Sequence, residues 1–184
     1  LSQLSKALHE KRTKYALKLS KELTERVQIL KMNGATIKLV LEELNDFNES
    51  GSTRANFVAE TNPGEGYFKV KDIASGGELS RILLAVRQIL SNHDSISIFL
   101  FDEIDTGIGG ETANCIGKAL FQVATNGQVI AITHLPQIAQ FADSLILVQK
   151  EIQADNKSSR TESSIKEITG KMVQKEVRAM SQLN

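Results

Sequence analysis

The sequence has little of several residue types, and its shortage of cysteine and of long apolar runs excludes several classes of protein. Its 184 residues include one cysteine, two prolines and no tryptophan. Cys115 has no second thiol to pair with, which excludes an intramolecular disulfide and a thiolate metal site. No apolar run approaches the about 20 residues of a membrane-spanning helix, and the first residues lack the apolar core of a signal peptide. We therefore expect a cytoplasmic protein, or a piece cut from one, with no membrane partner.

Net charge is also absent. The 22 Lys and Arg residues balance 22 Asp and Glu residues, so no strong overall attraction to nucleic acid or anionic lipid is expected. The balance hides an uneven distribution, because residues 1–31 hold eight basic and three acidic residues. Any electrostatic role must therefore be local.

The basic segment predicts one long helix. It has no Gly or Pro before Gly34, and its apolar residues recur three, four or seven positions apart. The residues of this stripe are Leu1, Leu4, Leu8, Tyr15, Leu19, Leu23, Val27 and Leu30. Two interpretations stay open: the end of a coiled-coil arm, or an amphipathic helix packed on a domain. Most of its lysines are expected on a solvated face.

The next segments and the tail are less specific. TIKLVLEEL fits a strand or a short helix, NDFNESGSTR is polar and turn-rich, and NFVAE fits a short strand. TNPGEG predicts a loop or hairpin turn. Near the end, SLILVQKEI and TESSIKEI predict a hairpin around the QADNKSSR turn, followed by a last helix in ITGKMVQKEVRAMSQ.

Residues 75–90, SGGELSRILLAVRQIL, predict an amphipathic helix that begins at a serine and two glycines. Ser75, Gly76 and Gly77 expose backbone amides at the positive end of the helix dipole. Such a helix start can bind a phosphate oxygen. A plain serine cap with a flexible glycine pair is the alternative.

Residues 95–105, SISIFLFDEID, predict a parallel strand covered on both faces that stops at two acids. Asp102 and Glu103 then lie where open α/β sheets bind their ligands. One carboxylate there can hold Mg²⁺ through water while its neighbour polarises an attacking water. A strand that ends in a solvated acidic turn is the alternative.

A helix in GGETANCIGKALFQVA and a second buried strand in VIAI follow. This strand–helix–strand order predicts two parallel strands that are neighbours or near neighbours in the sheet. His134 follows the second strand and is therefore expected at the same sheet edge as Asp102 and Glu103. An imidazole at that position could hydrogen-bond a terminal phosphate.

In this order, SGGE, IFLFDE and ITH resemble the signature, the Walker B strand with its catalytic glutamate, and the switch-histidine loop of an ABC-type ATPase head. More narrowly, ASGGELSRILLA, FDEIDTGIGG and THLPQIAQFAD resemble the RecN family of bacterial DNA-repair proteins, relatives of the SMC proteins. The specific match runs from about residue 61 to about residue 150. The resemblance implies an α/β fold, the C-terminal lobe of an ABC/SMC-type P-loop ATPase head with a partly parallel sheet and flanking helices. It implies a coiled-coil stub at 1–33 and the lobe at 34–184.

The resemblance also assigns roles to single residues. Asp102 would orient Mg²⁺, Glu103 would be the general base for the hydrolytic water, and His134 would sense the γ-phosphate of ATP. The signature residues would contact the γ-phosphate of a nucleotide held by a second head in a homodimer; they are Ser75, Gly76, Gly77 and Glu78. Asp105 would belong to the nucleotide site through the 105–110 loop at the dimer interface. That loop departs from most ABC proteins, which have an aspartate where this chain has Gly109.

The phosphate-cradling loop, GxxxxGK followed by Ser or Thr, is absent. By itself the chain should then not bind ATP tightly, and we expect an inactive fragment that needs its own N-terminal Walker A lobe. The resemblance implies that the full protein binds DNA in the bacterial cytoplasm, with the nucleoid, and acts in double-strand break repair and recombination.

Three alternatives remain. The chain could be an ATPase fragment of an ABC transporter, whose signature normally follows a compact helical subdomain rather than a long basic arm. It could be a metal-dependent nuclease with a site formed by Asp102, Glu103, Asp105 and His134. It could also be a head-dimerisation and DNA-tethering module without catalysis, against which the intact Glu103 argues.

Overall fold

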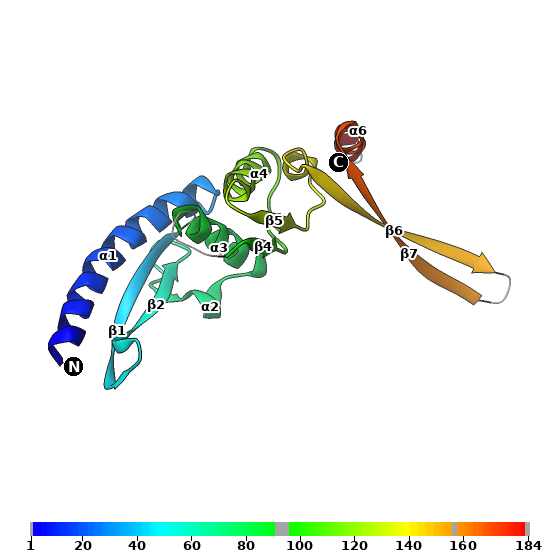
Figure 1. Ribbon diagram of the computed structural model, residues 1–184. Helices are drawn as coiled ribbons and strands as arrows, with labels where there is room; N and C mark the ends of the chain where they lie inside the picture. The colour runs from blue at the N-terminus through cyan, green and yellow to red at the C-terminus, as the bar shows by residue number, and fades with distance from the viewer. Residues whose placement is uncertain (1, 91–95, 156–157, 183–184) are drawn as a thin grey trace.

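A computed structural model describes residues 2–90, 96–155 and 158–182. Figure 1 shows an elongated arrangement in which a helix and two long strands lie at one end and a second hairpin projects from the other. The elements, in chain order, are α1 (Ser2–Ile29), β1 (Thr36–Asn48), β2 (Gly51–Glu60), β3 (Phe68–Lys69), α2 (Val70–Ile73), α3 (Gly76–Leu90), β4 (Ile98–Phe101), α4 (Gly110–Ala124), β5 (Gln128–Ala131), α5 (Pro136–Ala139), β6 (Ser144–Asp155), β7 (Ser158–Thr169) and α6 (Lys171–Gln182).

The first sheet is antiparallel, in the order β1-β2-β3. The TIKLVLEEL segment, which fitted either a strand or a short helix, is a strand because Thr36 to Glu43 pair in register with Thr53 to Glu60. Pairing resumes at Asn48 and Gly51, after a register shift, so much of the polar segment expected as a turn belongs to the strands. TNPGEG connects β2 to β3, as the turn residues indicated.

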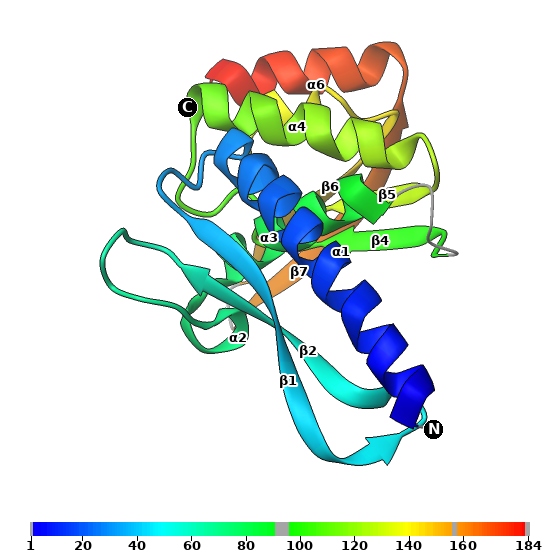
Figure 2. The same ribbon diagram turned by 90° about the vertical axis from the view of Figure 1, so that its left-hand side faces the viewer.

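Helix α1 confirms the expected long helix and lies along the β1–β2 hairpin (Figure 2). The Ser20 hydroxyl accepts a hydrogen bond from the Leu39 amide at 2.8 Å, and the Thr24 hydroxyl accepts one from the Ile37 amide at 3.0 Å. Farther toward the N-terminus, Arg12 Nη1 donates to Thr53 Oγ1 at 2.8 Å. Helix side chains thus satisfy backbone groups of the β1 edge, which fastens α1 to the sheet.

The apolar stripe of α1 divides into two parts. Leu23 and Val27 are buried in the main core, whereas Leu4, Leu8 and Tyr15 are exposed. The C-terminal half is therefore an amphipathic helix packed on the domain, one of the two interpretations that the sequence left open. The N-terminal half keeps an exposed apolar stripe.

The second sheet pairs β4 with β5 in parallel, in register from Ile98 opposite Gln128 to Phe101 opposite Ala131. Helix α4 connects the two strands and contacts β5, α3 and α5. This confirms the strand–helix–strand unit and the pairing of its strands as neighbours.

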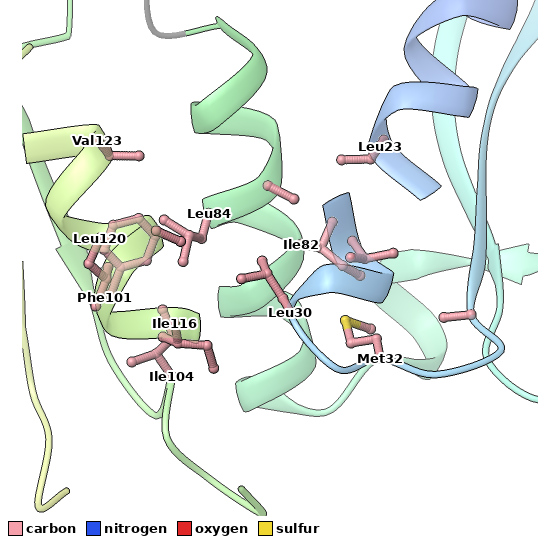
Figure 3. Close-up of a cluster of buried hydrophobic side chains, with 14 of the residues drawn as sticks. Leu23, Leu30, Met32, Ile82, Leu84, Phe101, Ile104, Ile116, Leu120 and Val123 are labelled. Atoms are coloured by element: carbon pink, nitrogen blue, oxygen red, sulfur yellow. The ribbon is translucent and has the colours of Figure 1, made fainter. Parts of the chain in front are cut away.

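Helix α3 lies between α1 and α4 in the core (Figure 3). From opposite sides of α3, Ile82 points toward Leu30 and Met32, and Leu84 points toward Leu120 and Phe101. All of these side chains belong to one buried cluster. Burying a leucine side chain of this kind stabilises the folded state by about 1.5–3 kcal/mol. Because side chains on both sides of α3 are buried, this helix joins the two halves of the molecule.

One expectation for β4 is wrong in this chain. The apolar run predicted a strand covered on both faces, but only Phe99 and Phe101 point into the core. Ile98 and Leu100 on the other face are 60% and 63% exposed, and Ile130 and Ile132 of the β5 segment are also exposed. Among the described residues, α3 and α4 pack only against the inward face of this sheet. The apolar side chains on its other face therefore remain exposed to solvent in this chain.

Strands β6 and β7 form an antiparallel two-stranded sheet that projects from the body of the molecule (Figure 1). Helix α6 follows and contacts β7 and α5. The hairpin and the last helix confirm the two predictions for the tail. Among the described residues, no helix combines the length and the apolar character needed to cross a bilayer.

We predict that Leu23→Ala destabilises the chain by about 2–5 kcal/mol, because the Leu23 side chain is fully buried on the inner face of α1. Leu17→Ala on the same helix is the matched control, since Leu17 is 72% exposed and its loss should change the free energy of unfolding by less than about 0.5 kcal/mol. Urea unfolding of both variants measures the difference. Equal effects would mean that α1 does not dock as described.

Candidate functional site

The residues singled out in the sequence meet where β4 and β5 end and α3 begins. A turn from Asp102 to Thr106 follows β4, and the Thr106 amide closes it by donating to the Glu103 carbonyl at 3.0 Å. His134 follows β5 at the same edge of the sheet, as expected. The start of α3 lies directly against the turn.

The SGGE segment forms a reciprocal helix cap. The Ser75 hydroxyl donates to Glu78 Oε2 at 2.8 Å, the Ser75 amide donates to the same oxygen at 2.9 Å, and the Glu78 amide donates back to Ser75 Oγ at 3.3 Å. This is the capping box of a serine followed three positions later by a glutamate. Ser75 and Gly76 remain exposed, so the cap presents its polar atoms to solvent.

The two glycines let α3 approach the turn closely. A Cβ on Gly77 would lie 2.9 Å from the Glu103 carbonyl oxygen and 3.2 Å from Thr106 Cβ. A Cβ on Gly76 would overlap the Glu103 carboxylate. Gly77 is therefore required for packing in this chain, whatever the glycine pair binds.

Glu103 has a left-handed backbone, with φ 55°. Only a few per cent of non-glycine residues adopt this conformation, which costs roughly 1–3 kcal/mol and clusters at functional sites. Its side chain is exposed beside Gly76 and Gly77. The turn thus presents one carboxylate at the sheet edge, beside the start of α3.

Asp102 is exposed at the end of β4, and its Oδ1 accepts a hydrogen bond from the Glu103 amide at 2.8 Å. The Asp102 carbonyl accepts one from the Ser80 hydroxyl of α3 at 2.7 Å. Mg²⁺ prefers oxygen ligands and is often bound through one or two carboxylates, waters and phosphates, so an exposed aspartate in this position fits it.

Arg81 is buried and ties α3 to the turn. Its Nη1 donates to the Thr106 carbonyl at 3.2 Å and lies 3.5 Å from the Ile104 carbonyl. Burial lowers the pKa of its guanidinium, and the charge of Glu78 opposes that shift. Arg81 was not among the residues predicted for the site, because an arginine between apolar helix positions is usually solvated.

Asp105 does not face Asp102 and Glu103 but turns inward. Its Oδ2 accepts hydrogen bonds from Thr133 Oγ1 at 2.6 Å and from the His134 amide at 2.9 Å. The same oxygen lies 3.0 Å from His134 Nδ1. Asp105 thereby joins the turn after β4 to the loop after β5, a contact that sequence spacing could not reveal. Thr133 was likewise missed.

These residues therefore separate into two sets. Glu103 lies with Gly76 and Gly77, and Asp105 lies with Thr133 and His134. In the described ranges no three carboxylate, imidazole or thiol side chains gather as metal ligands would. The four-residue arrangement needed by the nuclease alternative is not formed by these side chains.

Comparison with curated proteins identifies relatives over nearly the whole chain. It is 33% identical over 195 residues to DNA repair protein RecN of Streptomyces coelicolor, with 100% of the chain and 33% of the relative covered. It is 37% identical over 180 residues to RecN of Rickettsia bellii, with 93% of the chain and 33% of the relative covered. The chain belongs to the RecN family. It spans about a third of the length of these relatives, and no protein-family model matches it.

Solved structures give the fold of this RecN-family chain. The Smc head domain of Pyrococcus furiosus, bound to the C-terminal domain of ScpA, covers 94% of the chain at a TM-score of 0.58 and 21% identity; 38% of that structure is matched. A structure from work on ATP-driven dimerization of SMC ATPases covers 94% at a TM-score of 0.51 and 18% identity, with 93% of that chain matched. The chain therefore has the α/β fold of an SMC/ABC-type ATPase head, as expected from its motifs.

We predict that Gly77→Ala destabilises this chain by about 1–3 kcal/mol, because its Cβ would press on the backbone of the turn. Gly76→Ala is the matched control. Its Cβ meets only the flexible end of Glu103, so its free energy of unfolding should change by less than about 1 kcal/mol. Denaturant unfolding of the two variants decides between a packing role and a flexible hinge, which would tolerate both changes equally.

Proposed function

We propose that the chain is the C-terminal lobe of a RecN-type ATPase head that acts in DNA repair. In this role it supplies the signature residues, the Walker B aspartate, the catalytic glutamate and the switch histidine to an ATP site completed by other chains or segments. The observation that carries the proposal is the left-handed Glu103 at the end of β4, in contact with the glycines of SGGE. The three motifs of the resemblance thus lie at one edge of one sheet.

The partner that completes the head would be the N-terminal Walker A lobe. The chain has no phosphate-cradling loop, and the outer face of β4 and β5 exposes Ile98, Leu100, Ile130 and Ile132. A monomer rarely leaves such a contiguous apolar face uncovered. We infer that this face packs against the missing lobe, which would account for the apolar run in β4.

In the proposed reaction Glu103 accepts a proton from the attacking water, for which its exposed carboxylate at the sheet edge is suited. Asp102 would hold Mg²⁺ at this end of the sheet. When bound, Mg²⁺ would neutralise charge on the transferring phosphate of ATP. His134 hydrogen-bonds the γ-phosphate from the adjacent loop, where its side chain is 71% exposed.

The signature residues would act on a nucleotide held by a second copy of the head. Ser75 and Gly76 are exposed at the start of α3, whose dipole favours an anion. We propose that the 105–110 loop lies at the same dimer interface; through it Asp105 belongs to the nucleotide site. ATP binding would close two heads on each other and hydrolysis would reopen them.

The domain organisation follows from the same proposal. Residues 1–33 would be the end of a coiled-coil arm and residues 34–184 the lobe. The exposed stripe of Leu4, Leu8 and Tyr15 on α1 supports an arm helix with a missing partner. The named relatives are bacterial DNA repair proteins, so the full protein would bind DNA and work with the nucleoid in break repair and recombination.

We predict that this chain with Mg²⁺ hydrolyses ATP only after a Walker A lobe fragment is added. Glu103→Gln should lower that turnover by at least about 100-fold, because it removes the general base. Phosphate release measures both effects, and Glu43→Gln on β1, far along the chain from the site, is the matched control. The same Glu103→Gln change in the complete protein should leave ATP binding intact and trap closed heads.

Three results would contradict the proposal. Metal-dependent turnover by the chain alone would favour the nuclease or another self-contained hydrolase. Unchanged turnover in Glu103→Gln would remove Glu103 from the general-base role. A mixture that closes on ATP without turnover would favour the non-catalytic tethering module.

A further inference from the structure

Outside the contact of Glu103 with Gly76 and Gly77, the strongest polar cluster lies between the turn after β4 and the loop after β5. Three groups lie within hydrogen-bonding distance of a single carboxylate oxygen, Asp105 Oδ2: the Thr133 hydroxyl donates to it at 2.6 Å, the His134 amide donates at 2.9 Å, and the His134 ring atom Nδ1 lies 3.0 Å away. The Asp105 side chain is 8% exposed, whereas the His134 side chain is 71% exposed. One end of the pair is therefore anchored inside the protein and the other faces solvent.

We propose that Asp105 is a positioning residue that fixes the ring orientation and the tautomer of His134. An aspartate carboxylate accepts hydrogen bonds, so the Nδ1 atom that faces it carries the hydrogen. With the hydrogen on Nδ1, Nε2 is the nitrogen on the exposed side: it accepts a hydrogen bond in the neutral ring and donates one to a phosphate oxygen when both nitrogens carry a hydrogen, a form that the Asp105 carboxylate also pairs with. Asp105 thereby orients Nε2 toward a ligand bound at this end of the sheet.

The other two donors make this arrangement rigid. The His134 amide fixes the backbone at the ring's own residue, and Thr133 fixes the preceding residue. Thr133 Oγ1 also accepts a hydrogen bond from the Leu135 amide at 3.0 Å, which joins the loop to the start of α5. A carboxylate that meets both the backbone and the ring restricts the side-chain rotation of His134 more than a ring contact alone. This matters because an orienting group acts by limiting the geometries of the group that it holds.

The inference rests on the proposed function for what His134 contacts, but the tautomer can be tested without nucleotide. The chain has three histidines, His9, His93 and His134, so ¹⁵N-labelled imidazoles can be assigned with a His134→Gln variant. Long-range proton–nitrogen spectra at a pH where the rings are neutral should show the hydrogen of His134 on Nδ1. Finding it on Nε2 in the unmodified chain would overturn the proposal.

Two variants extend this test. In a folded Asp105→Asn chain the Nδ1–H form should lose its dominance, because the carboxylate that selects it is gone. Thr133→Val is the matched control: it removes one donor to the same oxygen but keeps Asp105 and the ring, so the tautomer should persist. The same tautomer in the unmodified chain and in Asp105→Asn would show that Asp105 does not select it.

The functional part is a double-mutant cycle in the complete ATPase. Asp105→Asn should lower kcat about tenfold, the lower end of what losing an orienting partner costs at comparable sites, with KM changed less than about twofold. In a His134→Gln background the same substitution should have no further effect, because residues that act as a unit are not additive. Additive losses would overturn a role through His134. An unaffected Glu103→Gln enzyme would instead defeat the proposed function and leave the tautomer result standing.

Discussion

The burial of helix α3 between α1 and α4 is the constraint on which the rest of the molecule depends. Ile82 on one side and Leu84 on the other connect the antiparallel hairpin to the parallel pair. With both sides of α3 committed to packing, its first turn has little freedom to move. The SGGE cap and the Asp102–Thr106 turn are held together by this packing, and the glycines allow the approach.

The turn after β4 is the meeting point of three segments that are far apart in the sequence. Arg81 binds its carbonyls from α3, Asp105 binds the loop after β5, and Glu103 faces the start of α3. Buried polar groups such as Arg81 and Asp105 cost free energy unless they are hydrogen-bonded, and both are satisfied here. Because both residues bond across the turn, a shift of the turn would leave the Arg81 guanidinium or the Asp105 carboxylate without its hydrogen-bond partners. In the proposed head, a movement of helix α3 would therefore displace Glu103 and, through the turn and Asp105, the loop that carries His134.

Much of the central fold could be predicted from sequence. The periodicity of residues 75–90 and 110–124 and the apolar runs before Asp102 and His134 predicted α3, α4 and the parallel pair, because local pattern and tertiary burial agree there. TIKLVLEEL stayed ambiguous because its apolar spacing fits both periods, and pairing with β2 decides it. The burial expected for β4 was wrong for this chain, because an apolar run reports the burial of a strand in its complete fold. Arg81 and the inward turn of Asp105 could not be predicted, because both depend on contacts between residues more than 20 positions apart.

The most direct test of the account is a structure of the complete protein carrying Glu103→Gln, determined with ATP and Mg²⁺. The account predicts two heads closed on two nucleotides, with Asp102 and His134 of one copy and Ser75 of the other around each γ-phosphate. It also predicts that Asp105 still accepts the His134 Nδ1 hydrogen and that the exposed face of β4 and β5 is covered by the Walker A lobe. A nucleotide bound away from this sheet edge, or a head that completes the site without a second copy, would contradict it.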